Sequence, residues 1–240
     1  MDLASATSAN ADLWHQLFGD QAEPPAAIVL VTAVAALLIV AVDGLWRPAR
    51  NVITIVHEAG HALTAVLAGR RLSGIRLHSD TSGLTLSRGK PSGPGMVLTA
   101  LAGYPAPSLL GVLFAALLAA DRLAVLLTVC ALLVLGSLVM VRNGYGVLLL
   151  LLAGAVLFAV SWFASDEVQA GFGYLITWLL LLGGLRPLGE LQRKRRRGRA
   201  RDSDADQLAR LTGAPALFWI LVCGLIGVGC LWVSAAWLLV

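Results

Sequence analysis

Three ionisable side chains lie inside one apolar run of the sequence, Val52-Ile53-Thr54-Ile55-Val56-His57-Glu58-Ala59-Gly60-His61-Ala62-Leu63-Thr64-Ala65-Val66-Leu67. As a helix, the stretch 51–68 is long enough to cross most of the roughly 30 Å of hydrocarbon in a bilayer. Ionisable residues inside a spanning segment are costly to bury, so they usually serve a function. The run therefore predicts a transmembrane helix that carries a polar site.

The spacing of these residues indicates what the site binds. In a helix, residues i and i+4 share one face, so His57 and His61 can offer two imidazole nitrogens to one Zn²⁺. Glu58 lies one position further round, where it can take a proton from a zinc-bound water and pass it to a leaving amine. A chance H-E-x-x-H match has an expectation of about 0.001 in a chain of this composition. The motif predicts a zinc hydrolase, and helix-packing histidines are the alternative.

The composition excludes a soluble globular domain. Hydrophobic residues make up 58% of the chain and charged residues 13%, and the mean hydropathy is +0.81. These values predict an all-α polytopic membrane protein with about seven transmembrane helices. The apolar runs expected to span the membrane are 26–45, 51–68, 95–120, 123–141, 145–163, 168–188 and 215–239. Residues 1–25 form a polar leader, and 26–240 are expected to form a single transmembrane domain.

The basic residues predict the orientation in the membrane, because Lys and Arg favour the cytoplasmic side. If the loops of a seven-span chain alternate sides, one face collects fifteen of the 18 Lys and Arg, and only Arg47, Arg50 and Arg122 lie opposite. This predicts an integral membrane protein with a cytoplasmic N-terminus and an external C-terminus. The basic run 192–201 is read as an orientation signal and an anionic-lipid contact, with no nucleic-acid partner expected.

Two interruptions follow the motif helix. The loop 69–92 contains two short alternating stretches around a Gly-containing turn, which predict a cytosolic β-hairpin whose apolar face joins Ile75 and Leu77 to Leu84 and Leu86. The hairpin is either a platform that adds a strand to an unwound substrate or a plain connection. In the third span, Tyr104-Pro105-Ala106-Pro107 predicts a bend, either beside the active site or for packing only.

Further candidates lie in the cytosolic loops. Asn143, in Arg142-Asn143-Gly144-Tyr145-Gly146, is a candidate to bond the substrate backbone or the developing oxyanion, with a simple turn as the alternative. A catalytic zinc takes three protein ligands and keeps an open position, so a carboxylate is required beside the two histidines. The loop 189–214 is first basic and then acidic, and Asp202, Asp204 and Asp206 are its candidate ligands. A helix N-cap is the alternative role for one of them.

Four segments together resemble the site-2 protease class of intramembrane zinc metallopeptidases, in its compact bacterial branch. They are His57 to Arg71, Ala102-Gly103-Tyr104-Pro105, Arg142 to Gly146 and Ser203 to Pro215. The resemblance covers roughly residues 50 to 220. Better-known members carry the last ligand in a Leu-Asp-Gly break within a transmembrane helix, a sequence that this chain lacks.

The resemblance implies His57 and His61 as metal ligands, Glu58 as general base and acid, and Asp204 as the third ligand. The resemblance also implies a bacterial plasma membrane as the location. The expected function is zinc-dependent hydrolysis of a peptide bond in a transmembrane or membrane-adjacent segment of another protein. An inactive membrane scaffold and a zinc-binding transporter are the alternatives. The sequence leaves open the substrate, its cleavage site, the trigger and the oligomeric state.

Overall fold

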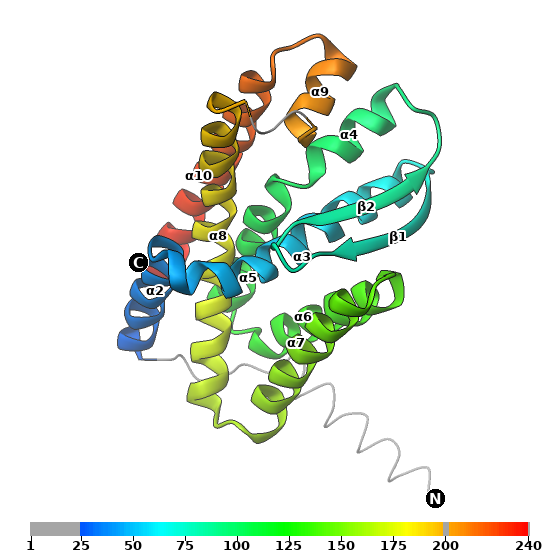
Figure 1. Ribbon diagram of the computed structural model, residues 1–240. Coiled ribbons are helices and arrows are strands. Elements are labelled where there is room, and N and C mark those ends of the chain that lie inside the picture. Colours follow the sequence, from blue (N-terminus) through cyan, green and yellow to red (C-terminus); the bar gives the residue numbers. More distant parts are fainter. Residues whose placement is uncertain (1–24, 199–201, 240) are drawn as a thin grey trace, which may run out of the picture.

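The computed structural model describes residues 25–198 and 202–239, and it is mainly helical (Figure 1). The predicted leader 1–25 lies almost wholly outside the described residues. A two-stranded sheet interrupts the helices after α3. The elements are α2 (Ala26–Ala41), α3 (Asp43–Leu67), β1 (Arg71–Leu77), β2 (Gly83–Arg88), α4 (Pro94–Ala102), α5 (Pro105–Ala119), α6 (Leu123–Met140), α7 (Gly144–Phe163), α8 (Asp166–Arg196), α9 (Asp204–Thr212) and α10 (Ala216–Leu239).

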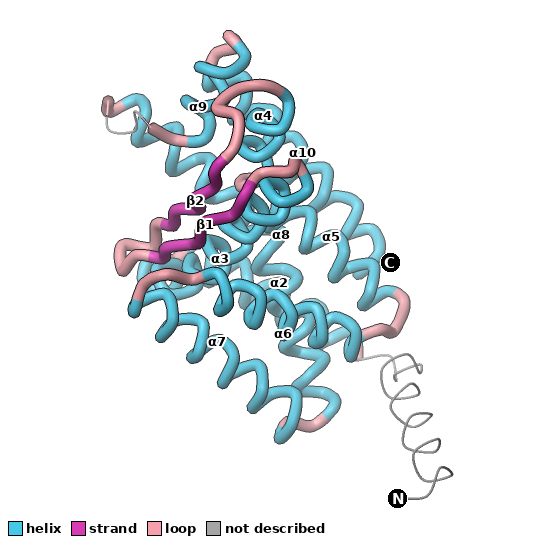
Figure 2. The backbone as a smooth tube through the Cα atoms, turned by 90° about the vertical axis from the view of Figure 1, so that its right-hand side faces the viewer, coloured by secondary structure: helices cyan, strands magenta, loops and turns pink. Residues whose placement is uncertain are grey.

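The long helix α8 is the centre of the fold and packs against α2, α5 and α10. Glycines bring these helices close together, since a Cβ on Gly111 of α5 would meet Leu181 of α8 at 2.8 Å and one on Gly227 of α10 would meet Leu185 at 2.6 Å. Small residues at helix crossings are the usual means of tight packing in a bilayer, where no hydrophobic force drives helices together. By contrast, α6 and α7 each contact the other more than they contact any other element, and they form an outlying pair (Figure 2).

The number of spans differs from the seven predicted. Four helices, α6, α7, α8 and α10, are long and apolar enough to cross a membrane alone. Two further pairs pass only together, α2 with α3, bent by 102°, and α4 with α5, bent by 68°. The described chain thus has four to six candidate spans. The bend before Pro105 was predicted, whereas the bend at Val42, which has an extended backbone, was not, because the Asp43-Gly44 pair just after it was counted within the apolar run 26–45.

The bend at Val42 also corrects the predicted direction of the first span. A seven-span chain would run α2 antiparallel to α8. Instead the two are parallel, because Ile28 lies near Gly171 at the start of α8 and the Arg186 side chain, further along α8, donates to the Val40 carbonyl. Counting α2 and α3 as one bent span gives six spans, which places Ala26 on the same side as the end of α10.

The same bend moves two basic residues that were predicted to lie opposite the others. Arg50 forms an ion pair with Glu190 of α8 at 3.4 Å. Arg47 and Arg50 line a cavity together with Arg186 and the hairpin tip. They therefore lie on the basic side, whereas Arg122 follows α5 at the opposite end of the bundle.

The predicted hairpin is present, but its register differs from the prediction. The strands are antiparallel and pair Ile75 with Thr85 and Leu77 with Gly83. Directly opposed residues share a face of the sheet, so the buried Ile75 and Leu77 lie with Thr85 and Gly83. Leu84 and Leu86 are exposed on the other face, and the expected four-residue apolar face is wrong. The turn 78–82 does not by itself fix which residues of the two strands pair. A shift of one residue in this register moves every side chain of a strand to the other face of the sheet.

Candidate metal centre

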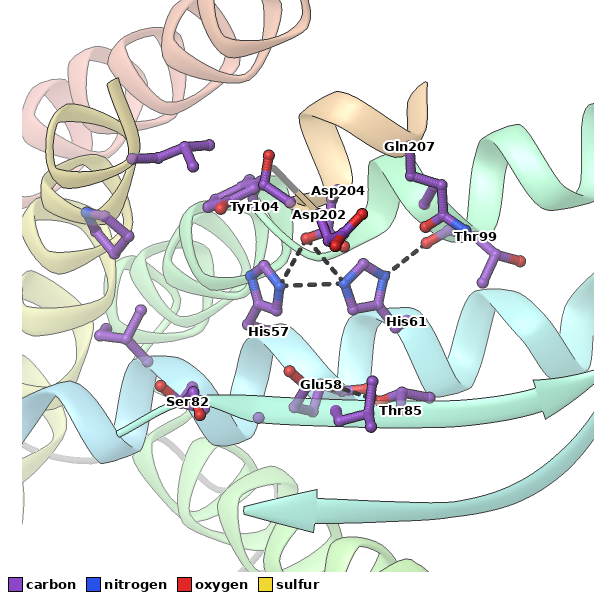
Figure 3. A pocket seen from close by; sticks show the side chains of 18 of the residues that line it. His57, Glu58, His61, Ser82, Thr85, Thr99, Tyr104, Asp202, Asp204 and Gln207 are labelled. Carbon is purple, nitrogen blue, oxygen red and sulfur yellow. Dashed lines mark hydrogen bonds and ion pairs between the residues drawn. The ribbon is translucent and has the colours of Figure 1, made fainter. Parts of the chain in front are cut away.

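The centre of the site is on α3, where His57 and His61 project from one face as their spacing predicted (Figure 3). Their Nε2 atoms are 3.1 Å apart. Asp204, 147 residues further along the chain than His57, places its Oδ2 3.1 Å from His57 Nε2 and 3.3 Å from His61 Nε2. Among the aspartates 202, 204 and 206, only Asp204 joins the histidines in the described part of the chain.

Asp204 reaches the histidines because α9 begins there and is held firmly at that end. Ser203 is its N-cap and forms a reciprocal capping box with Asp206, which satisfies two backbone N–H groups at the helix start. The Arg195 side chain at the end of α8 donates to Asp206. The N-cap that the sequence left open for an aspartate is therefore Ser203, and Asp206 supports it from the N3 position. Asp204, two residues before Asp206, faces the histidines.

The donor set fits a tetrahedral zinc ion. Ligand bonds of roughly 2.0–2.1 Å in that geometry place neighbouring ligand atoms about 3.3 Å apart, which matches the three separations between the nitrogens and the carboxylate oxygen. His61 Nδ1 lies 2.7 Å from the Thr99 carbonyl oxygen. Because a carbonyl only accepts, this contact fixes the proton on Nδ1 and leaves the Nε2 lone pair free for a metal.

The break between α4 and α5, at Gly103 and Tyr104, packs against the rings of the two histidines. The Tyr104 ring meets His57 edge-on, with 4.8 Å between ring centroids. A Cβ on Gly103 would lie 2.3 Å from His61 Nε2 and 2.6 Å from His57 Nε2. Only a residue without a side chain leaves room for the rings here.

Glu58 lies further round α3 than the histidines, between this helix and β2 (Figure 3). Its side chain is buried, with 4% of the residue exposed, and the Thr85 hydroxyl donates to its Oε2 at 2.6 Å. Glu58 nevertheless lines the same open cavity of about 490 Å³ as His57, His61 and Asp204. The residues of β2 from Gly83 to Ser87 form one wall of this cavity.

The comparison with protein families agrees with this geometry. The family model described as Peptidase M50B-like matches residues 30–234. The chain belongs to this family. The match confirms the resemblance to the site-2 proteases inferred from the motifs. No curated protein and no solved structure matches the chain.

Membership of the Peptidase M50B-like family indicates a membrane metallopeptidase. The three residues from α3 and α9 are the set that the sequence resemblance implied as ligands. Burial by itself raises the pKa of the Asp204 carboxyl, but hydrogen bonds and charge interactions with His57 and His61 outweigh burial and hold this pKa well below its usual value. The carboxylate is therefore ionised at neutral pH, as a metal ligand must be.

Asn143 does not join the centre of this Peptidase M50B-like protein. Its Oδ1 accepts from the Leu77 backbone N–H at 3.1 Å, and its Nδ2 donates to the Leu77 carbonyl at 2.6 Å. The neighbouring Arg142 N–H donates to the Ile75 carbonyl. Asn143 therefore closes the edge of β1 away from β2, and this pairing with Leu77 favours the turn that the sequence left as its alternative role; a contact of Asn143 with the substrate or an oxyanion stays a prediction.

Sequence reasoning missed the partners of the ligands. The contact of the Thr99 carbonyl with His61 has no side-chain signature, since any residue supplies a carbonyl. Thr85 carried a weak signal, because it alternates with leucines in β2 and so faces the opposite side from them. The space required at Gly103 could not be read from its neighbours in the sequence.

Proposed function

We propose that this protein is a zinc-dependent intramembrane endopeptidase that hydrolyses a peptide bond in a transmembrane or membrane-adjacent segment of another protein. The main support for the proposal is that three side chains of the type and spacing of zinc ligands converge on a cavity that Glu58 also lines. The match to the Peptidase M50B-like family supports the same class of reaction.

His57, His61 and Asp204 would hold the metal and leave a position open to the cavity. Bound zinc would supply a water of lowered pKa and polarise the scissile carbonyl. Glu58 would take the proton of the attacking water and return it to the leaving amine nitrogen. The contact between His61 Nδ1 and Thr99 would keep the imidazole in the ligating tautomer.

The free edge of β2 is the best candidate for substrate docking. Its other edge is paired to β1, and residues 83–87 line the cavity. An extended peptide could add a third strand there through backbone hydrogen bonds. A helical substrate hides its carbonyls in i to i+4 bonds, so the substrate must unwind, and segments with helix-weakening residues should be cleaved faster.

The basic side would face the cytoplasm by the positive-inside rule. The hairpin, Arg142, Arg186 and the end of α8 lie on this side, now joined by Arg47 and Arg50. The metal centre would then be nearer the cytosol. With six spans, Ala26 and the end of α10 would both face outward, which reverses the cytoplasmic N-terminus that seven spans implied.

Zinc content and cleavage measured together distinguish the candidate functions. The purified protein in liposomes would be incubated with dye-labelled single-span peptides, with and without a central Asn-Gly-Pro sequence. A protease with Glu58→Gln keeps its zinc and loses cleavage, whereas a transporter shows altered zinc flux and no cleavage in either form. An inactive scaffold cleaves none of the peptides.

The ligand set has its own test. Asp204→Ala should lose zinc, as should His57→Ala and His61→Ala. Asp202→Ala is the matched control, because the Asp202 side chain is 92% exposed and its ion-pair partner is Arg210 at 3.7 Å. Retention of zinc by the histidine variants would refute every metal hypothesis, and loss of zinc only in the Asp202 variant would refute the assignment of Asp204.

A further inference from the structure

One face of β2 is shaped around the side chain of Glu58. Gly83 and Thr85 are two residues apart in the strand and therefore point to the same face. This face is turned to α3, whereas Leu84 and Leu86 point away from it and are exposed. Both Gly83 and Thr85 meet Glu58, and each does so in a different way.

Thr85 fixes the direction of the carboxylate. Its hydroxyl lies 2.6 Å from Glu58 Oε2 and 3.1 Å from the Glu58 backbone carbonyl. A hydroxyl has one hydrogen to donate, and the nearer carboxylate oxygen is its stronger acceptor. Threonine is also stiff about χ1, so the strand backbone determines where this donor points. One oxygen of Glu58 is thereby held, and the other remains to act.

Gly83 provides the space that the carboxylate occupies. A Cβ at this position would lie 2.5 Å from both Cγ and Oε1 of Glu58. Contacts below 3.0 Å essentially never occur for real Cβ atoms. The φ angle of Gly83 is not in the left-handed region. The glycine is therefore required for room and not for backbone conformation.

We propose that Gly83 and Thr85 form a seat on β2 that positions Glu58 for proton transfer, so Thr85 is a positioning residue for the reaction. The inference rests on the proposed function, in which Glu58 is the general base. It adds a second role for β2. The edge of this strand would align the substrate, and the face turned to α3 orients the carboxylate of Glu58. A base held in place in this way needs no reorganisation during proton transfer.

Isosteric substitutions test the seat. Thr85→Val keeps the shape and removes the donor, and Thr85→Ser restores the donor without the methyl group. We expect Thr85→Val to lower kcat by about 10- to 100-fold, the cost of misplacing a catalytic group, with unchanged zinc content and KM within about threefold. Thr85→Ser should recover most of kcat. Thr128→Val on α6, where the exposed hydroxyl donates to the Ala124 carbonyl of its own helix, is the matched control and should have wild-type kcat.

Gly83→Ala gives a second, independent measurement. The added methyl group should displace the Glu58 carboxylate and lower kcat while zinc stays bound. A Thr85→Val enzyme with kcat within twofold of wild type overturns the seat, as does a Thr85→Ser enzyme as slow as Thr85→Val, since packing would then explain the loss. Cleavage by the wild type in these cases leaves the proposed function standing. Absence of cleavage by the wild type itself overturns both.

Discussion

The substitution Gly103→Ala tests the geometry of the metal centre with one methyl group. Gly103 has right-handed helical angles, φ −60° and ψ −60°, which alanine adopts freely. The backbone therefore does not resist the change. All of the effect must come from the new Cβ, which would lie 2.3 Å from His61 Nε2 and 2.6 Å from both Cε1 and Nε2 of His57.

The size of the effect follows from these distances. Ordinary contact of a Cβ begins near 3.4 Å, so the His61 ring must move by about 1 Å or the α4–α5 break must open. Metal–ligand distances tolerate only about ±0.2 Å. At least one histidine is then lost as a good ligand. Because disturbing a mere supporting residue already costs 10- to 100-fold in affinity, we expect zinc to bind at least about 100-fold more weakly, which is about 2.8 kcal/mol.

The assay is competition for zinc between the detergent-purified protein and a chromogenic chelator, with metal analysis of the same samples. Gly136→Ala is the control, since its added Cβ meets nothing within 4 Å and should leave zinc affinity unchanged. Melting temperatures of the metal-free proteins show whether either variant has unfolded. If Gly103→Ala stays folded and binds zinc within threefold of the wild type, the metal does not lie between these two rings.

Three further outcomes are expected. Asp206→Asn should weaken zinc binding by about tenfold, because it loosens the start of the helix that carries the third ligand, whereas Asp202→Asn should not; equal affinities would contradict this role. Asn143→Ala should destabilise the protein by about 1–3 kcal/mol by unpairing a strand edge, seen as a lower melting temperature with unchanged zinc content. The hydroxyl and N–H of Ser82 lower the pKa of Asp80 below 3.8, so the turn should be more ordered above that pH and lose this order as the pH falls through the lowered pKa; constant amide exchange at Ser82 across this range would contradict it.

The sequence predicted those features that depend on neighbouring residues. The four-residue spacing of His57 and His61 guarantees a shared helix face wherever the helix lies. The hairpin at 71–88 followed from alternation around a turn, and the break before Pro105 from the chemistry of proline. The motif resemblance also singled out Asp204. Each of these features depends on residues that are close together in the sequence.

The sequence-based prediction differs from the structure where each long apolar run was counted as a separate span. Two apolar runs near the N-terminus were counted as two spans, but the bend of 102° at Val42 joins them into a single candidate span. That bend is held by α8, since the Arg186 side chain bonds both the Val40 carbonyl and Asp43. Hydropathy measures how apolar a segment is and gives no information about a contact with a helix far along the chain.

The sequence by itself therefore determined the chemistry of this protein, two imidazoles and a carboxylate on one helix buried among apolar side chains. Only the tertiary structure decided how that chemistry is completed. It brought Asp204 to the histidines across 147 residues, placed Thr85 under Glu58 and turned Asn143 away to β1. The physical reason is that covalent spacing fixes positions along one helix, whereas contacts between elements depend on close packing of surfaces that no local pattern records.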